Sequence, residues 1–197
     1  IEVLRGPAAV LNGEGGTGAT INLVSRLPSF TKQPVELDYA YGSFNAHRLH
    51  AGTGGVIKDD AVAYRADLST NRYGSNVHGE RTVLDRFTGS LLFKLSDKLK
   101  LTLELDKLRD DVQDYYYGTP LVNGKIARSL RRVNYNNLTD NVYASDTTWL
   151  RTQLEWQATP DLLLRSQTYA YDSFRNWRDV DDFTYIATLQ PFNAALM

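Results

Sequence analysis

The chain has 197 residues, with 22 Lys and Arg against 23 Asp and Glu, so its formal net charge at pH 7 is -1. This balance excludes the basic surface on which nucleic-acid-binding proteins depend. The absence of cysteine excludes disulfides, thiol nucleophiles and cysteine-ligated metal sites. No apolar run approaches the roughly 20 residues of a membrane-spanning helix, and 3 Trp, 12 Tyr and 7 Phe are too many for a disordered chain.

The chain begins inside a strand pattern at Ile1, and its single methionine is the last residue, Met197. No signal peptide is recognisable in the opening residues. We therefore expect the sequence to be an excerpt from a longer protein, and its cellular location stays open at this point.

The first 30 residues predict two short strands joined by a glycine-rich reversal. Residues 1–5 and 19–25 have strand character, and Pro7 suits the first position of a brief helical turn. The intervening glycines match the spacing of a dinucleotide-binding loop with its later acidic residue: Gly13, Gly15, Gly18 and Asp38. That fold needs a long helix directly after the loop, and the sequence leaves no room for one. The glycines are therefore interpreted as positions of a chain reversal.

From residue 34 onward, apolar and polar residues alternate with a period of two. Because successive side chains of a strand point to opposite faces, each such segment has one apolar and one charged face. The pattern predicts seven strands, over residues 34–42, 46–57, 61–73, 83–95, 99–115, 148–158 and 162–177. In the last of these segments the parity of the apolar residues shifts partway along.

The connections between these strands alternate between short and long. Residues 58–60, 96–98 and 159–161 are predicted to be tight turns, whereas residues 74–82 and 116–147 form longer connections. Short turns at one end and longer loops at the other are typical of an outer-membrane barrel rather than of a soluble sandwich. Several segments are also longer than the about five or six residues of an average soluble strand.

Three further features fit a barrel without deciding the question. Phe93 and Trp156 lie just before tight turns, where an interfacial aromatic girdle would lie, although ordinary core aromatics fit the same positions. The charged face of each strand suits a wet lumen or, equally, the solvent face of a soluble sheet. Seven strands are an odd number and too few to close around a plug, and an open sheet would have two bare edges. The excerpt interpretation accounts for that count.

The N-terminal residues also carry a recognisable signature. It comprises IEVLRGP at residues 1–7, VLNG at 10–13 and GATINLVSRLP at 18–28. Together these segments resemble the end of the plug domain in TonB-dependent outer-membrane receptors. The chain departs from the family pattern at Asn12, where tyrosine is usual, and at Ala19, where a second glycine is usual; neither change removes the turn.

Weaker motifs then follow in the order found in ferric-siderophore receptors of this family. They are YGSF at residues 41–44, the Asp59-Asp60 turn and the segment 83–107. The resemblance thus extends over essentially the whole chain, and its specificity comes from the N-terminal signature.

The resemblance implies an all-β fold in two parts. Residues 1–30 would be the C-terminal end of the plug, and residues 31–197 about seven strands of an antiparallel transmembrane β-barrel of about 22 strands. It further implies an active transporter, not an enzyme, in the outer membrane of a Gram-negative bacterium, surrounded by outer-membrane lipid. A ferric siderophore would be captured from outside as a transported ligand rather than a cofactor, and TonB, energised from the inner membrane, would displace the plug.

For individual residues, the resemblance implies that Arg5 pairs with glutamates of the barrel and helps to hold the plug. Those partners are expected beyond residue 197, and the alternative is an ordinary surface arginine after a strand. The structural turn of the same signature comprises Gly6, Pro7, Gly13, Gly15 and Gly18.

One candidate for ligand contact is a run of tyrosines. Tyr115, Tyr116 and Tyr117 lie at the expected outer end of a long strand. Hydroxamate-siderophore receptors carry similar residues there, and their aromatic side chains line the binding site; Thr119 stands where those receptors have a tryptophan. Tyrosine offers apolar area together with a hydroxyl donor, which suits a chelate, although an interfacial aromatic belt fits the same residues.

A second candidate group is Arg175, Trp177 and Arg178, which would meet an anionic chelate at another loop mouth. The sequence holds no catalytic constellation, and His47, His50 and His78 form no metal-ligand pattern. The aspartates at 110, 111, 114, 179, 181 and 182 lack the spacing and glycine of a calcium loop, so solvated loops are expected and no metal site is predicted.

Other functions remain open from the sequence alone. A passive porin would not carry the plug signature of the first 28 residues. A soluble β-sandwich binding module would tolerate the alternation of apolar and polar residues. Within the receptor family, cobalamin, haem or a glycan are alternatives to a ferric siderophore.

Overall fold

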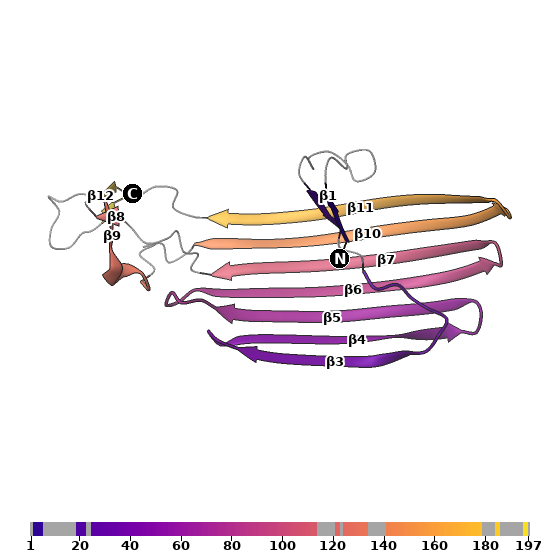
Figure 1. Ribbon diagram of the computed structural model, residues 1–197, viewed down its shortest axis with the longest axis horizontal. Helices are drawn as coiled ribbons and strands as arrows, with labels where there is room; N and C mark the ends of the chain where they lie inside the picture. Colours follow the sequence, from indigo (N-terminus) through magenta and orange to yellow (C-terminus); the bar gives the residue numbers. More distant parts are fainter. Residues whose placement is uncertain are drawn as a thin grey trace.

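The computed structural model describes residues 2–5, 19–22, 25–113, 121–122, 124–133, 141–178, 184–185 and 195–196. Seven long strands form one antiparallel sheet (Figure 1): β3 (Gln33–Gly42), β4 (Ala46–Lys58), β5 (Val62–Gly74), β6 (Arg81–Ser96), β7 (Leu99–Gln113), β10 (Val142–Thr159) and β11 (Leu162–Arg178). Their order in the sheet is their order in the chain. The predicted all-β fold with seven consecutive antiparallel strands is confirmed.

Short elements complete the described residues. β1 (Glu2–Arg5) and β2 (Ala19–Asn22) form an antiparallel pair, in which Arg5 is opposite Ala19. A dinucleotide fold would join two parallel strands here, so the antiparallel pairing confirms the predicted chain reversal. The other short elements are β8 (Leu121–Val122), β9 (Lys125–Ile126), the 3-10 turn η1 (Arg128–Leu130), β12 (Thr184–Tyr185) and β13 (Ala195–Leu196). No helix in the described part of the chain is long and apolar enough to cross a membrane.

Tight turns join the long strands at one end of the sheet, and the other end carries the three-residue turn 43–45 followed by longer connections (Figure 1). The tight turns occupy residues 59–61, 97–98 and 160–161, as predicted. In the second of them, Lys94 Nζ lies 2.8 Å from Asp97 Oδ1, and this hydrogen bond lowers the pKa of the Asp97 carboxyl. The predicted alternation of short and long connections is therefore a property of the fold.

Strand β10 departs most from its predicted bounds. It begins at Val142 rather than at residue 148, whereas β7 ends at Gln113, close to the predicted residue 115. Residues 143–147 pair with β7 on one side and residues 142–147 with β11 on the other. Their side chains show no apolar alternation, so the sequence pattern marks them as a connection. Backbone hydrogen bonds to two neighbouring strands extend β10 where the side-chain pattern gives no signal.

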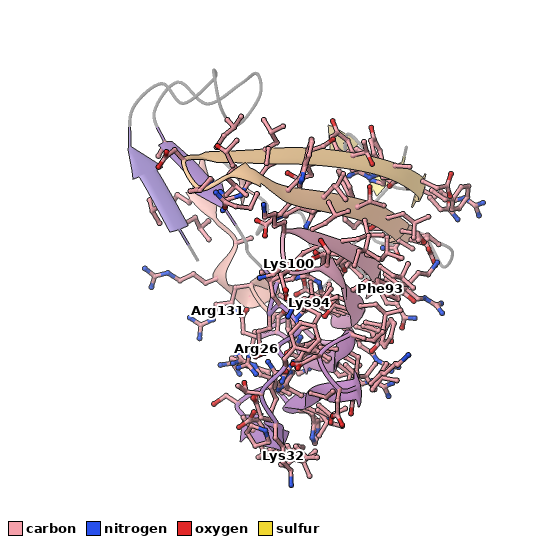
Figure 2. All side chains as sticks on the ribbon, turned by 90° about the vertical axis from the view of Figure 1, so that its right-hand side faces the viewer. Arg26, Lys32, Phe93, Lys94, Lys100 and Arg131 are labelled. Atoms are coloured by element: carbon pink, nitrogen blue, oxygen red, sulfur yellow. The ribbon has the colours of Figure 1, made fainter. Side chains whose placement is uncertain are left out.

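Alternate side chains of each strand point to opposite faces of the sheet, and the register shows which residues of neighbouring strands share a face. One row of paired residues crosses the sheet as Glu36, Gly52, Asp67, Thr88 and Asp106. The adjacent row crosses it as Leu37, Ala51, Leu68, Phe87 and Lys107. We call the face that carries Glu36 and Asp67 the polar face and the other the apolar face. Seen along the strands, the sheet is curved, with Arg26 on one side of it and Phe93 on the other (Figure 2).

The sheet is a single layer. Ala63 and Val77 are the only buried hydrophobic side chains among the described residues. On the apolar face, Leu37 and Tyr39 are 73% and 63% exposed. A soluble β-sandwich would cover this face with a second sheet, and the described part of the chain contains none. A face of this kind requires an apolar medium or partner.

Candidate functional site

An arginine that lies flat across its neighbouring strand organises the polar face. Arg65 of β5 is only 3% exposed. Its Nε donates to Asp67 Oδ2 at 2.7 Å, and its Nη1 lies 3.6 Å from Oε1 of Glu36 on β3. The guanidinium therefore bridges β4 to reach a carboxylate two strands away. A buried arginine is retained at acceptable cost only when such partners surround it.

Two glycines of β4 leave space above this strand for side chains of its neighbours. A Cβ added at Gly52 would lie 2.5 Å from Arg65 Nη2 and 2.5 Å from Asp67 Oδ1. A Cβ added at Gly54 would lie 1.9 Å from Gln33 Oε1 and 2.9 Å from the carbonyl oxygen of Tyr64. Both residues are on the polar face, where β4 would otherwise present side chains. The glycines thus provide a channel for the arginine and the glutamine of adjacent strands.

A histidine joins the same group of charges. His50 Nδ1 lies 3.3 Å from Asp38 Oδ2, and its Nε2 lies 3.1 Å from Asp67 Oδ1. Glu36, Asp38 and His50 hold their ligand atoms within 4.8 Å of one another, a spacing that a metal ion would accept. Arg26 and Arg65 both pair with Glu36, however, so this carboxylate already has two cationic partners. We assign the group as an ion-pair network.

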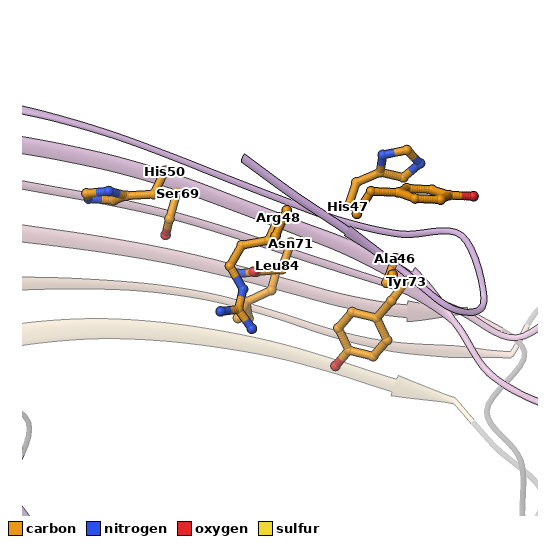
Figure 3. A pocket seen from close by; sticks show the side chains of 11 residues that line it. Ala46, His47, Arg48, His50, Ser69, Asn71, Tyr73 and Leu84 are labelled. Atoms are coloured by element: carbon orange, nitrogen blue, oxygen red, sulfur yellow. The ribbon is translucent and has the colours of Figure 1, made fainter. Parts of the chain in front are cut away.

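The neighbouring histidine, His47, belongs to the apolar face. Its Nδ1 is 2.8 Å from the hydroxyl of Tyr39, and its ring lies 5.0 Å from that of Tyr41. Figure 3 shows His47 on the opposite side of the strand from Arg48. His47 and His50 therefore cannot act on a common ligand.

A second charged group lies on β7 and β10. Glu104 is 9% exposed and accepts hydrogen bonds from Arg151 Nη1, at 3.1 Å to Oε1 and 3.2 Å to Oε2. Ser25 Oγ donates to the same Oε1 at 2.9 Å. One row further along the sheet, Arg86 and Asp106 pair through two hydrogen bonds. Charge-assisted bonds of this kind are stronger than neutral ones, and they tie neighbouring strands together on the polar face.

Aromatic side chains occupy the polar face of β10 and β11. The ring of Trp149 stacks on Tyr171 at a centroid distance of 4.6 Å and an interplanar angle of 22°. Tyr169 lies 5.8 Å from the same Trp149 ring. Nearer the loop end of the sheet, Tyr143 contacts Trp177 edge-on at 5.8 Å. Tyr169, Tyr171 and Trp177 remain largely exposed, so this wall offers flat aromatic surface to a molecule within the curve of the sheet.

A hollow of about 610 Å³ lies near the loop end of β3–β6. Arg48, Asn71 and Tyr73 project from the same side of the strands into this region (Figure 3). A guanidinium, an amide and a phenol together present donors to an anionic or hydroxyl-rich molecule.

The predicted site residues fall into three groups. Arg175 and Trp177 have the same parity on β11 and lie together on the polar face, whereas Arg178, opposite Val142, points to the other face. The backbone of Arg5 lies in β1, and its side chain is outside the described part of the structure. Also outside the described residues are Gly6, Pro7, Gly13, Gly15, Gly18, Tyr115, Tyr116 and Tyr117.

The sequence analysis did not identify Trp149, Tyr169 and Tyr171 as residues of the polar face, although the sequence itself contains a signal for them. The parity shift in the last predicted strand arises because Tyr169 and Tyr171 take polar-face positions, whereas Leu164 and Phe174 take apolar-face positions. Trp149 likewise has the parity of Arg151 and not of Leu150. Aromatic residues on the charged face of a strand are available to contact a molecule on that face.

No protein-family model matches the chain. Solved structures with a similar fold include the following three. The first is FpvA of Pseudomonas aeruginosa bound to a heterologous pyoverdine with iron, at 21% identity and a TM-score of 0.76, covering 86% of this chain and 23% of FpvA. The second is the complex of FpvAI with pyocin S2, at 22% identity and a TM-score of 0.76, covering 86% of this chain and 23% of that one.

The third is the ferripyoverdine receptor of the outer membrane of Pseudomonas aeruginosa bound to ferripyoverdine. It is 22% identical with a TM-score of 0.74, and the match covers 84% of this chain and 22% of the receptor. The chain thus spans less than a quarter of the length of the structures that it matches. At the level of fold, the predicted resemblance to a siderophore receptor is confirmed: the chain has the architecture of one segment of such a receptor.

The glycine channel leads to a stability prediction. We expect Gly52→Ala to destabilise the folded protein by about 1–3 kcal/mol, because the added methyl group displaces the buried Arg65–Asp67 pair. Gly42→Ala is the matched control, since its Cβ would meet only the Ala46 Cβ at an ordinary 3.6 Å. Urea unfolding in detergent micelles, followed by tryptophan fluorescence, measures both. Equal stability of the two variants would contradict the packing that we describe.

Proposed function

We propose that this chain belongs to a TonB-dependent receptor of the bacterial outer membrane that imports a ferric siderophore. In this proposal, residues 1–30 are the end of the plug and residues 31–197 are the first strands of the barrel. The observation that carries the proposal is the single-layer sheet of seven long strands with one apolar and one charged face. A soluble domain would not expose an apolar face of this size to water. The plug signature at residues 1–28 supports the same assignment.

The two faces give the sheet an orientation in this proposal. The apolar face, with Leu91, Leu103 and Leu154, is turned to the lipid, and the polar face is turned to the lumen. The tight turns lie on the periplasmic side and the longer connections on the external side. Lys107 and Asp146 form an ion pair on the apolar face toward the loop end, a place that projects beyond the hydrocarbon.

The ligand would be bound at the external end and along the lumen wall. Arg175 and Trp177 lie at the loop end of β11, and the tyrosines 115–117 are assigned to the connection that follows β7. Guanidinium groups suit an anionic ferric chelate, and aromatic rings suit its flat organic groups. Arg178 points to the other face and is the weakest of these candidates.

The solved relatives support a siderophore over the other substrates of the family. Their names describe receptors bound to ferripyoverdine or to other pyoverdines with iron, and one is bound to pyocin S2. These proteins are transport receptors rather than enzymes. For this chain we propose a ferric siderophore as ligand and TonB as the partner that supplies energy; cobalamin, haem and glycans are the alternatives that a transport assay separates.

The orientation of the sheet is tested by placing a charge on each face in turn. We expect Leu103→Arg to cost about 2–4 kcal/mol, because an arginine on a lipid-facing strand must be dehydrated near the bilayer centre. Thr102→Arg, the neighbouring residue on the polar face, is the control and keeps the yield of folded protein. The measurements are the folded fraction in the outer membrane and urea unfolding in lipid vesicles. A larger loss from Thr102→Arg would reverse the orientation.

The ligand site is tested with two tryptophans on opposite faces. Trp177→Ala removes an exposed ring at the loop end of the polar face, and we expect the affinity for a ferric pyoverdine to fall roughly tenfold. Trp156→Ala, on the apolar face near a tight turn, leaves the affinity unchanged. Quenching of tryptophan fluorescence by the chelate, in the protein expressed from its complete gene, gives both values. Equal losses in the two variants would remove Trp177 from the binding site.

A further inference from the structure

The segment that leads from β2 into the barrel strands is attached to the polar face at two adjacent residues. We call residues 25–32 the linker. Ser25 Oγ donates to Glu104 Oε1 at 2.9 Å, and the next residue, Arg26, pairs with Glu36. The carbonyl oxygen of Leu27 accepts from Gln33 Nε2 at 3.3 Å, and Pro28 is buried.

The two acceptors lie far apart in the sheet. Glu36 is on β3 and Glu104 is on β7, and β4, β5 and β6 separate these strands. Two consecutive residues therefore connect opposite sides of the curved polar face. A chain that is fixed at two separated points on a concave wall can neither slide along it nor rotate freely about either contact.

Both acceptors are themselves held in place. Glu104 accepts from Arg151 of β10, and Glu36 lies beside the buried Arg65 of β5. Each carboxylate thus has a guanidinium of the sheet on one side and a residue of the linker on the other. Both contacts are charge-assisted; the one between Ser25 and Glu104 is partly buried, whereas the one between Arg26 and Glu36 is exposed.

From these contacts we infer that residue 25 is the fixed boundary of plug movement: Glu36 and Glu104 are positioning residues that keep Ser25 and Arg26 on the barrel wall throughout transport. This inference rests on the proposed function. Residues before Ser25 move when TonB displaces the plug, and the linker stays with the barrel. The chain is thereby retained at a defined point and returns to the same place after each cycle.

A reducible cross-link between cysteines at the two positions tests this inference, in the protein expressed from its complete gene. The 197 residues contain no cysteine, so the pair Ser25→Cys and Glu104→Cys adds the only thiols of this region. Because a cysteine side chain is shorter than the glutamate that it replaces, a short bis-methanethiosulfonate reagent spans the gap between the two thiols. We expect the cross-link to form and uptake of ferric pyoverdine in the cross-linked protein to stay within twofold of the reduced protein. A loss of more than tenfold that a reductant reverses would show that residue 25 must leave the wall, and would overturn the inference.

A matched pair controls for the loss of Glu104. Ser90→Cys with Glu104→Cys joins β6 to β7 on the same face, because these two residues are paired across the strands. It removes the same carboxylate without tethering the linker, so any defect common to both pairs comes from the loss of Glu104 and not from the tether.

The yield of the cross-link is a second, independent readout. Mass spectrometry of the cross-linked Ser25→Cys, Glu104→Cys protein should find the bridge with or without chelate present. Failure of this bridge to form, while the Ser90→Cys, Glu104→Cys pair closes with the same reagent, would contradict the attachment itself. If the unsubstituted protein takes up no ferric chelate, the proposed function fails, and the cross-link still decides whether residue 25 is fixed to the sheet.

Discussion

The period of two along a strand governs everything else in this molecule. Because the strands are long and the sheet has one layer, each residue position is committed to one of two surroundings by its parity alone. Burial against a hydrophobic core has no part in this choice, since the described residues contain almost no such core. The apolar face is stable only against an apolar medium or partner. The polar face carries charged side chains that would be costly to bury in a closed protein interior.

The charges on the polar face are held by shared partners rather than by isolated pairs. Arg65 forms ion pairs with both Glu36 and Asp67, and His50 contacts both Asp38 and Asp67. Separate exposed ion pairs contribute little to stability, whereas a network in which Glu36 and Asp67 each have two partners keeps its geometry. The same arrangement extends to the linker, so the charges that connect the strands also fix the segment that enters from β2.

Most of the fold could be predicted from the sequence, because alternation and turn residues are local signals. The bounds of the seven long strands fall within two residues of the predicted ones except at the start of β10, where Tyr143, Ser145 and Thr147 gave no apolar pattern. The candidate site was harder. Arg65 and Glu36 are distant in the sequence, and their contact depends on the register of three strands and on two glycines between them. Trp149 and Tyr171 were visible only as a shift of parity whose meaning needed the register of the pairing strands.

The channel formed by Gly52 and Gly54 has a consequence for how this sequence can change over generations. The space above β4 is shared, since it is filled by side chains of the adjacent strands, Arg65 and Asp67 over Gly52 and Gln33 over Gly54, and is closed to any side chain from β4 itself. A smaller residue at position 65 would relax the selection for glycine at position 52, whereas glycine at position 54 is required by Gln33 and by the carbonyl oxygen of Tyr64. Positions 52 and 65 should therefore be exchanged together among homologues, as one inherited unit.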